Sequence, residues 1–302
     1  MPKLPAFAAV LAACALIVHR SGAAETTLAL VGGRIYPSPD AAPIDDGVVI
    51  VAGTRIAAVG PRRSVRVPAN ADAIDCHGAV VTAGFQNSHV HFTEPKWNDA
   101  DKQPATTLTA QLQTMLTRYG FTTVVDTASL LPNTIALRRR IERQDVAGPR
   151  ILTAGLALYP PDGIPYYLKE EVPADLLKLL PQPSTPREAA NIVRRNIEGG
   201  ADIIKLFTGS NVSPVRVLPM GDDVAKAAVD AAHRRGMLVF AHPSNVAGLE
   251  VALRARVDVL AHAIEDTRGL TAEHLRGMRQ QNMALVPTLK LLGDGDDRPV
   301  GV

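Results

Sequence analysis

The sequence of 302 residues contains few aromatic residues, two cysteines and almost no net charge. Aromatic residues make up 4% of the chain, which argues against a platform on which nucleic-acid bases stack. The formal net charge is +2 and the basic residues are dispersed, so the sequence predicts no nucleic-acid partner. The absence of a GxGxxG or P-loop pattern removes the usual sequence argument for a nucleotide-binding sheet.

The sequence also lacks an apolar run of the ~18 residues that a membrane-spanning helix needs. The apolar stretch Leu4–Val18, followed by small residues that end at Ala24, instead predicts a signal peptide over residues 1–24. We therefore expect a periplasmic or secreted protein with no membrane span after signal cleavage. The alternatives are an uncleaved N-terminal anchor and a lipoprotein anchored at Cys14. Once the signal is removed only Cys76 remains, so no intramolecular disulfide is expected.

Beyond the signal, the hydrophobic pattern divides the chain at about residue 80. Residues 25–80 hold short β-branched runs separated by glycine-containing turns, which predicts a small β unit, part of a β-sandwich, built from hairpins. In residues 81–302, apolar runs alternate with amphipathic helices, which favours an α/β fold. Seven runs are expected to be strands: 80–89, 121–126, 150–154, 202–208, 237–242, 257–262 and 283–287. Buried strands in this order favour a (β/α)8 TIM-type barrel, incomplete with about seven strands, over an open sheet.

The helix predicted with the clearest boundaries lies in "STPREAANIVRRNIEGGAD". Thr185 can cap its start, Pro186 suits the first helical position, and Glu188 completes a capping box. Gly199 and Gly200 predict its end.

Four histidines and one lysine lie at or near the carboxyl ends of predicted strands. In a strand, residues i and i+2 share a face, so His89 and His91 of "VVTAGFQNSHVHF" are expected to point the same way. His242 and His262 end two further apolar runs, and Lys205 lies inside "ADIIKLFTGS", where an unpartnered lysine is costly. Active sites of such barrels lie at the carboxyl ends of the strands, and imidazole is the commonest metal ligand. The pattern therefore predicts a metal site.

These motifs resemble the metal-dependent amidohydrolase superfamily. The matching features are "DCHGAVVTAGFQNSHVHF", the lysine of "GADIIKLF", and the histidines of "AHPSN" and "AHAIED", which look most like its imidazolonepropionase-like and prolidase-like branch. The resemblance implies two divalent metal ions, usually zinc, with His89 and His91 on the more buried ion and His242 and His262 on the other. It implies that CO2 converts Lys205 to a bridging carbamate. It also implies that a metal-activated hydroxide hydrolyses an amide C–N bond.

Two positions depart from that family pattern. Family members commonly carry aspartate two residues before the first histidine, where this chain has Asn87. They also carry a catalytic aspartate at the end of strand eight. The tail "GDGDDRPVGV" has no apolar strand before its aspartates, so we assign the catalytic aspartate to no residue and expect a barrel truncated before strand eight.

Three hypotheses follow from the second departure. The chain is a fragment of an active secreted hydrolase, a catalytically impaired metal-binding pseudoenzyme, or a subunit whose missing strand comes from a partner chain. Open strand edges favour association, so a homo-oligomer is included among the expected partners.

Substrate residues are predicted from two loops after the third and fourth strands. Tyr159 and Tyr166, together with Tyr167, lie in the long segment "GLALYPPDGIPYYLKEEVP", which either covers the metals or is a packed surface excursion. Arg216 is a candidate for binding a substrate carboxylate, and a solvated arginine is the alternative. With the resemblance, this suggests a small-molecule substrate such as a dipeptide or N-acyl amino acid; a lactone, cyclic amide or carbamate fits the same chemistry.

Overall fold

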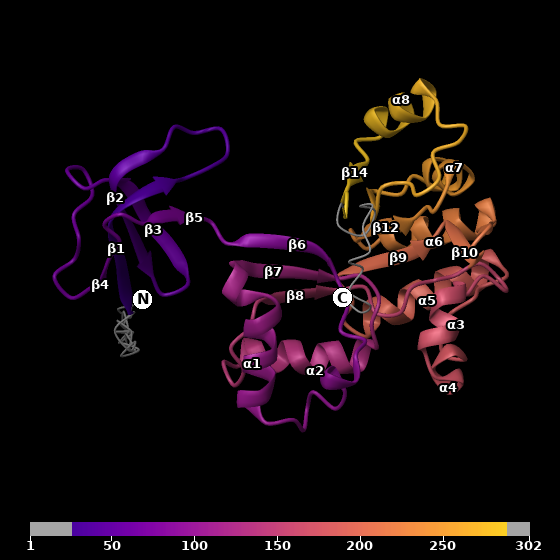
Figure 1. Ribbon diagram of the computed structural model, residues 1–302, viewed down its shortest axis with the longest axis horizontal. Helices are drawn as coiled ribbons and strands as arrows, with labels where there is room; N and C mark the ends of the chain where they lie inside the picture. Colours follow the sequence, from indigo (N-terminus) through magenta and orange to yellow (C-terminus); the bar gives the residue numbers. More distant parts are fainter. Residues whose placement is uncertain (1–25, 289–302) are drawn as a thin grey trace, which may run out of the picture. The chain divides into compact units, whose positions relative to one another are not determined.

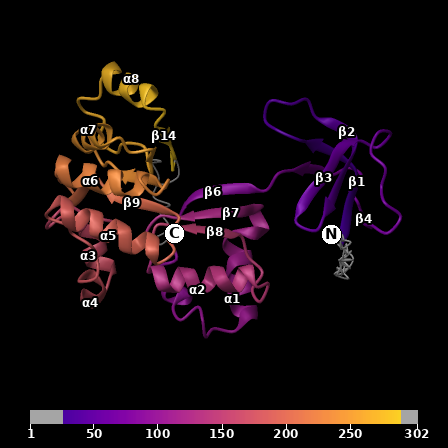
Figure 2. The same cartoon turned by 180° about the vertical axis from the view of Figure 1, so that it is seen from behind.

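The computed structural model describes residues 26–288, and the chain divides into two compact units, Met1–Ala83 and Gly84–Val302. Figure 1 and Figure 2 show the two units from opposite sides. The predicted signal peptide and the tail aspartates at positions 294, 296 and 297 lie outside the described residues. Among the helices of residues 26–288, none has the length and apolar character needed to cross a membrane.

The first unit is one five-stranded sheet. Its strands are β1 (Thr27–Tyr36), β2 (Ile44–Ala52), β3 (Arg55–Pro61), β4 (Asp72–Asp75) and β5 (Val80–Thr82). Antiparallel pairing of β1 with β2 and of β2 with β3 forms two hairpins. The turn between β2 and β3 contains the predicted glycine of "AGT", whereas the pair Gly32–Gly33, also predicted as a turn, lies inside β1. The pairings of β4 and β5 with β1 are parallel, so these two strands are not hairpin arms. Ala29, Val48 and Ile50 are buried in its small core.

The run predicted as a single strand over residues 80–89 is in fact two strands in different units. Val80–Thr82 forms β5 in the first unit, and β6 (Phe85–Val90) begins the second. Between them, Gly84 lies so close to Thr122 that a Cβ atom at position 84 would overlap the threonine side chain. Continuous apolar character hid this break, because it does not show where a strand changes its partner.

The second unit contains seven parallel strands within its described residues. They are β6, β7 (Phe121–Asp126), β8 (Arg150–Thr153), β9 (Ile203–Phe207), β12 (Leu238–His242), β13 (Val259–Leu260) and β14 (Ala284–Leu285). Two sheets, β6-β7-β8 and β9-β12-β13-β14, are linked where the amide of Asp202 donates to Thr153 O at 2.8 Å and Leu158 bridges to Leu206. The predicted fold class is confirmed: these strands form an incomplete α/β barrel of the TIM type.

Helices follow most of these strands along the chain. Helices α1 and α2 lie on one face of the β6-β7-β8 sheet (Figure 1, Figure 2). The helices are α1 (Ala105–Met115), α2 (Leu131–Glu142), α3 (Tyr166–Glu171), α4 (Ala174–Leu177), α5 (Pro186–Glu198), α6 (Asp222–His233), α7 (Val246–Ala255) and α8 (Ala272–Gln280). Short 3-10 turns occupy Pro95–Trp97 and Thr117–Tyr119, and β10 (Gly209–Ser213) pairs antiparallel with β11 (Arg216–Pro219).

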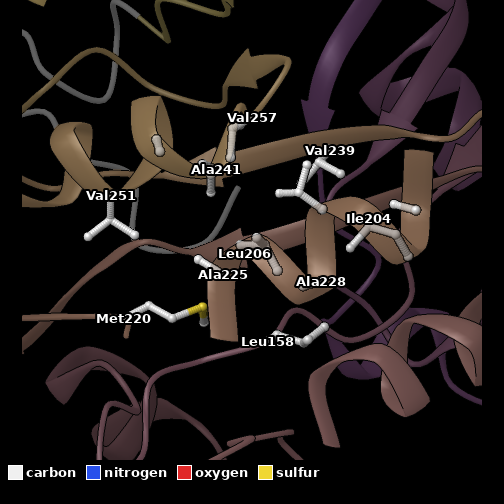
Figure 3. Packing of buried hydrophobic residues seen from close by; sticks show 14 of the residues in the cluster. Leu158, Ile204, Leu206, Met220, Ala225, Ala228, Val239, Ala241, Val251 and Val257 are labelled. Carbon is white, nitrogen blue, oxygen red and sulfur yellow. The ribbon is translucent and has the colours of Figure 1, made fainter. Parts of the chain in front are cut away.

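Alternation along β9 sorts its side chains between two cores. Ile204 and Leu206 pack with Ala225 and Ala228 of α6 in the outer core, as Figure 3 shows. Ile203 instead joins a separate inner cluster with residues of β7, β12 and β13. Since residues i and i+2 of a strand share a face, Lys205 and Phe207 lie on the inner side with Ile203.

The predicted capping box at α5 is present, and its removal should weaken the fold. Thr185 Oγ1 accepts from the amide of Glu188 at 3.3 Å, and Glu188 Oε2 accepts from the amide of Thr185 at 3.3 Å. Substituting Thr185→Ala should lower the free energy of unfolding by about 1 kcal/mol in urea denaturation. Arg187→Ala, at an exposed position of the same first turn, is the matched control and should leave stability within about 0.5 kcal/mol. Equal stability of both variants would contradict a capping role.

Candidate metal centre

Lys205 is a buried cation that faces the interior of the incomplete barrel. Lys205 is 2% exposed, and its Nζ lies 5.5 Å from the centre of the Phe207 ring. Burial lowers the pKa of Lys205 from 10.5 to about 7. A substantial fraction of this lysine is therefore the neutral amine near neutral pH, the form that reacts with CO2.

Four imidazoles from three strand ends form a continuous row beside this lysine. The ring centres of His91 and His89 are 5.0 Å apart, those of His89 and His262 are 4.4 Å apart, and those of His262 and His242 are 4.5 Å apart. The structure thus brings together every histidine that the sequence assigned to the metal site. Although they are far apart in the sequence, the parallel strands place their carboxyl ends on one side of the barrel.

Hydrogen bonds orient the first two imidazoles in the row. Nδ1 of His89 donates to the carbonyl of Ala261 at 2.9 Å, and Nδ1 of His91 donates to the carbonyl of Ala128 at 3.1 Å. This tautomer leaves the lone pair of each Nε2 free, and the two Nε2 atoms lie 3.1 Å apart. Asn87, at the position where family members carry aspartate, accepts the amide of His89 at 3.1 Å.

The other two imidazoles contain buried nitrogen atoms without partners. Both ring nitrogens of His242 and Nδ1 of His262 are buried and make no hydrogen bond in the described part of the chain. Such groups are costly, at about 1–3 kcal/mol each. A buried imidazole nitrogen that lacks a protein partner is available to an external ligand, and that points to a metal ion.

The electrostatics of the row keep the imidazoles neutral. Burial, followed by the charge of Lys205, lowers the pKa of all four histidines, and that of His91 falls to about 4. Neutral imidazole is the form that binds metal ions, so little competition from protons is expected at neutral pH.

The donor set fits a divalent metal ion of the zinc type. Two Zn–N bonds of about 2.0–2.1 Å at near-tetrahedral angles span about 3.1–3.4 Å, which matches the separation of Nε2 atoms in His89 and His91. Within residues 26–288, no three His, Cys, Asp or Glu side chains already surround a common point as in a preformed cage. The arrangement is a row of donors with a lysine beside it.

The three predicted substrate residues lie in different surroundings. Tyr159 is buried and stacks on Phe207 at 4.4 Å between ring centres, and Phe207 in turn stacks on His242 at 4.5 Å. Tyr166 is half-buried at the start of α3, where it contacts the ring of Tyr167. Arg216 is exposed at the start of β11, and its side chain makes no ion pair or hydrogen bond within residues 26–288.

Two further groups lie near this row: Tyr167, one of the three tyrosines that the sequence placed in the loop, and Glu265, which the sequence did not single out. Tyr167, next to the predicted Tyr166, has its pKa raised by burial and by the nearby Tyr159 and Glu265. Glu265 Oε1 lies 4.0 Å from Nε2 of His242. A carboxylate directly after "AHAI" was a visible signal, because it follows a strand-end histidine in the same loop.

The second residue that the sequence did not single out is Asp126, a fully buried carboxyl group at the end of β7. Burial raises its pKa to about 6, against the opposing effect of hydroxyl and amide donors. The sequence signal was an acidic residue ending the apolar run "FTTVVD", in the same place along a strand as the histidines.

Parallel strands with ionisable side chains at their carboxyl ends define a barrel whose active site lies at that end. The chain belongs to the amidohydrolase family, whose model matches residues 80–296. It is 30% identical over 141 residues to two uncharacterized proteins, Rv2915c of Mycobacterium tuberculosis and Mb2939c of Mycobacterium bovis. That alignment covers 47% of this chain and 35% of each relative, so the matched part is about a third of their length.

Solved structures share this fold over most of the chain. A Bifidobacterium longum protein described provisionally as a prolidase is 25% identical to this chain, with a TM-score of 0.71. The match covers 88% of this chain and 62% of the Bifidobacterium longum chain. A prolidase solved with N-methylphosphonate-L-proline is 26% identical, with a TM-score of 0.70, and the match covers 87% of this chain and 66% of the prolidase. The A. niger ochratoxinase is similar in fold alone, because it is 19% identical with a TM-score of 0.71. The match covers 89% of this chain and 66% of the ochratoxinase.

Proposed function

We propose that this chain carries the metal site of a secreted hydrolase that cleaves an amide C–N bond. The observation that carries the proposal is the row of four neutral imidazoles beside a buried lysine. Three buried nitrogens of the row make no hydrogen bond within residues 26–288. Membership of the amidohydrolase family supports the same class of reaction.

Each residue of the row has a distinct role in this proposal. His89 and His91 would hold one divalent ion, and His242 and His262 would hold a second. Lys205, as its carbamate, would supply oxygen ligands. Zinc bound there would polarise the substrate carbonyl and supply hydroxide near pH 7.

The protein groups around the row exclude water and orient the substrate. The ring stack of Tyr159, Phe207 and His242 forms an apolar wall on one side. Tyr166 and the exposed guanidinium of Arg216 are proposed to contact the substrate, the latter through a carboxylate. A dipeptide or N-acyl amino acid offers that carboxylate, and a similar prolidase was solved with a proline phosphonate.

The proposal is tested on the 302-residue chain loaded with zinc and bicarbonate. Elemental analysis should find about two zinc ions per chain, as a binuclear site requires. Hydrolysis should be measured against N-acetyl amino acids and X-Pro dipeptides, with zinc in buffer and the Lys205→Met variant as controls. A chain that takes up no zinc would refute the proposal. Zinc uptake without hydrolysis would support the metal site and contradict hydrolysis by the 302-residue chain itself, as both the fragment and the pseudoenzyme hypotheses predict.

A further inference from the structure

Asp126 accepts hydrogen bonds from three different segments of the second unit. Its Oδ1 accepts from Ser129 Oγ at 2.6 Å, and its Oδ2 accepts from Thr153 Oγ1 at 2.8 Å and from Thr134 Oγ1 at 3.1 Å. The backbone amide of Ala128 lies near this carboxyl group and acts to lower its pKa. Asp126 therefore fixes the loop that follows β7, from residue 127 to residue 129.

The same loop contacts the chain on both sides of the His91 ring. The carbonyl of Ala128 accepts from Nδ1 of His91 at 3.1 Å. Oγ of Ser129 accepts from the amide of Phe92, the residue after His91, at 2.8 Å. Before the histidine, the amide of Thr127 donates to the carbonyl of Val90 at 3.1 Å.

Two connections thus run from Asp126 to His91. The hydrogen-bonded one passes through the hydroxyl of Ser129 to the backbone after His91. The other runs along the loop that Ser129 fastens to Asp126, to the carbonyl of Ala128 that accepts from Nδ1. Asp126 itself lies on the outer side of β7, since it accepts from Thr134 of α2 and alternates with Val125 of the inner cluster.

We propose that Asp126 is a positioning residue that holds His91 in its Nδ1–H tautomer, through Ala128 and Ser129, so that Nε2 faces the metal site. This inference rests on the proposed function of the row. Groups behind a metal-binding histidine set its tautomer and ring orientation, and their loss commonly reduces metal affinity about 10- to 100-fold.

The proposal distinguishes the hydrogen bonds of Asp126 that lead to His91 from those that do not. Asp126→Asn keeps the shape of the side chain and removes its charge. Ser129→Ala leaves Asp126 in place and breaks one connection to His91. Thr134→Val is the matched control, because it removes a hydrogen bond to the same carboxyl group from the α2 side.

The test measures three properties of the 302-residue chain and these variants. Nitrogen-15 NMR of the metal-free chain reports the tautomer of His91, titration with zinc alone reports affinity, and urea denaturation reports stability. Asp126→Asn and Ser129→Ala should lose the single Nδ1–H tautomer and bind zinc about 10- to 100-fold more weakly. Thr134→Val should be less stable but keep the wild-type tautomer and zinc affinity.

The positioning role is overturned if Asp126→Asn and Ser129→Ala lose stability alone, as Thr134→Val does, and keep both the tautomer and the zinc affinity. Should Asp126→Asn fail to fold, Ser129→Ala still decides the question. A wild-type chain that binds no zinc would end the proposed function, whereas the tautomer comparison on metal-free chains would still decide the role of Asp126.

Discussion

Replacing His242 with phenylalanine should stabilise the metal-free chain and greatly reduce its response to zinc. Both ring nitrogens of His242 are buried and make no hydrogen bond within residues 26–288, whereas its ring stacks on Phe207 at 4.5 Å between centres. Phenylalanine keeps the stacking and removes the unpartnered nitrogens, which should raise the free energy of unfolding by about 1–3 kcal/mol. The melting temperature should rise by about 2–4 °C per kcal/mol for a unit of this size.

Zinc should reverse the order of stability, so that the wild-type chain becomes more stable than His242→Phe. At a concentration about 100 times the dissociation constant, zinc should stabilise the wild-type chain by about 2.7 kcal/mol, and the variant should respond far less. His233→Phe is the control, because His233 lies outside the row and its Nε2 bonds to Asp258 at 2.8 Å. That variant should be destabilised and should keep its zinc response. If His242→Phe and His242→Leu were both less stable than the metal-free wild type, His242 would be a structural residue.

Replacing Lys205 with methionine should also stabilise the metal-free chain, in a manner that depends on pH. Burial lowers the pKa of Lys205 to about 7 in the folded chain, against 10.5 for an ordinary lysine. Between these values the unfolded chain binds the proton that the folded chain has released, so wild-type stability rises with pH across this window. Below pH 7 both states are protonated, and burying the charge costs on the order of a few kcal/mol.

The advantage of Lys205→Met should therefore be greatest below pH 7 and should shrink as pH rises toward 10. Urea denaturation at pH 6, 7, 8 and 9.5 measures it as the difference between variant and wild type. Lys226→Met, at an exposed position of α6 whose amine pairs with Asp230, is the control and should show no such trend. Carbon-13 NMR with labelled bicarbonate and zinc should detect a carbamate in the wild type alone. A difference in stability that does not change with pH would contradict a buried, neutral Lys205.

Local signals in the sequence were sufficient where one segment decides its own structure. The capping box of Thr185 and Glu188 uses groups three residues apart, so it could be predicted and is present. The alternation of strands and helices similarly led to the correct fold class. The run 80–89 was misread, because pairing partners that are distant in the chain decide whether an apolar run is one strand or two.

In the candidate site, too, some features follow from local sequence and others from residues that are distant in the chain. The sequence identified four histidines and a lysine because polar residues in apolar strands are costly and therefore conspicuous. It overlooked Asp126, whose partners Thr134 and Thr153 come from other segments. It also favoured Tyr166, although burial and the nearby Tyr159 and Glu265 raise the pKa of its neighbour Tyr167.

By itself, the sequence determined which residues are candidates for the site, since residue type and strand position need only local information. Only the tertiary structure decided that the rings of His91, His89, His262 and His242 form one row. It also decided which ring nitrogens are already bonded and which lack partners. These properties depend on distances between strands that are far apart in the chain. They also depend on burial, which lowers the pKa of Lys205 and leaves the nitrogens of His242 without a hydrogen bond within residues 26–288.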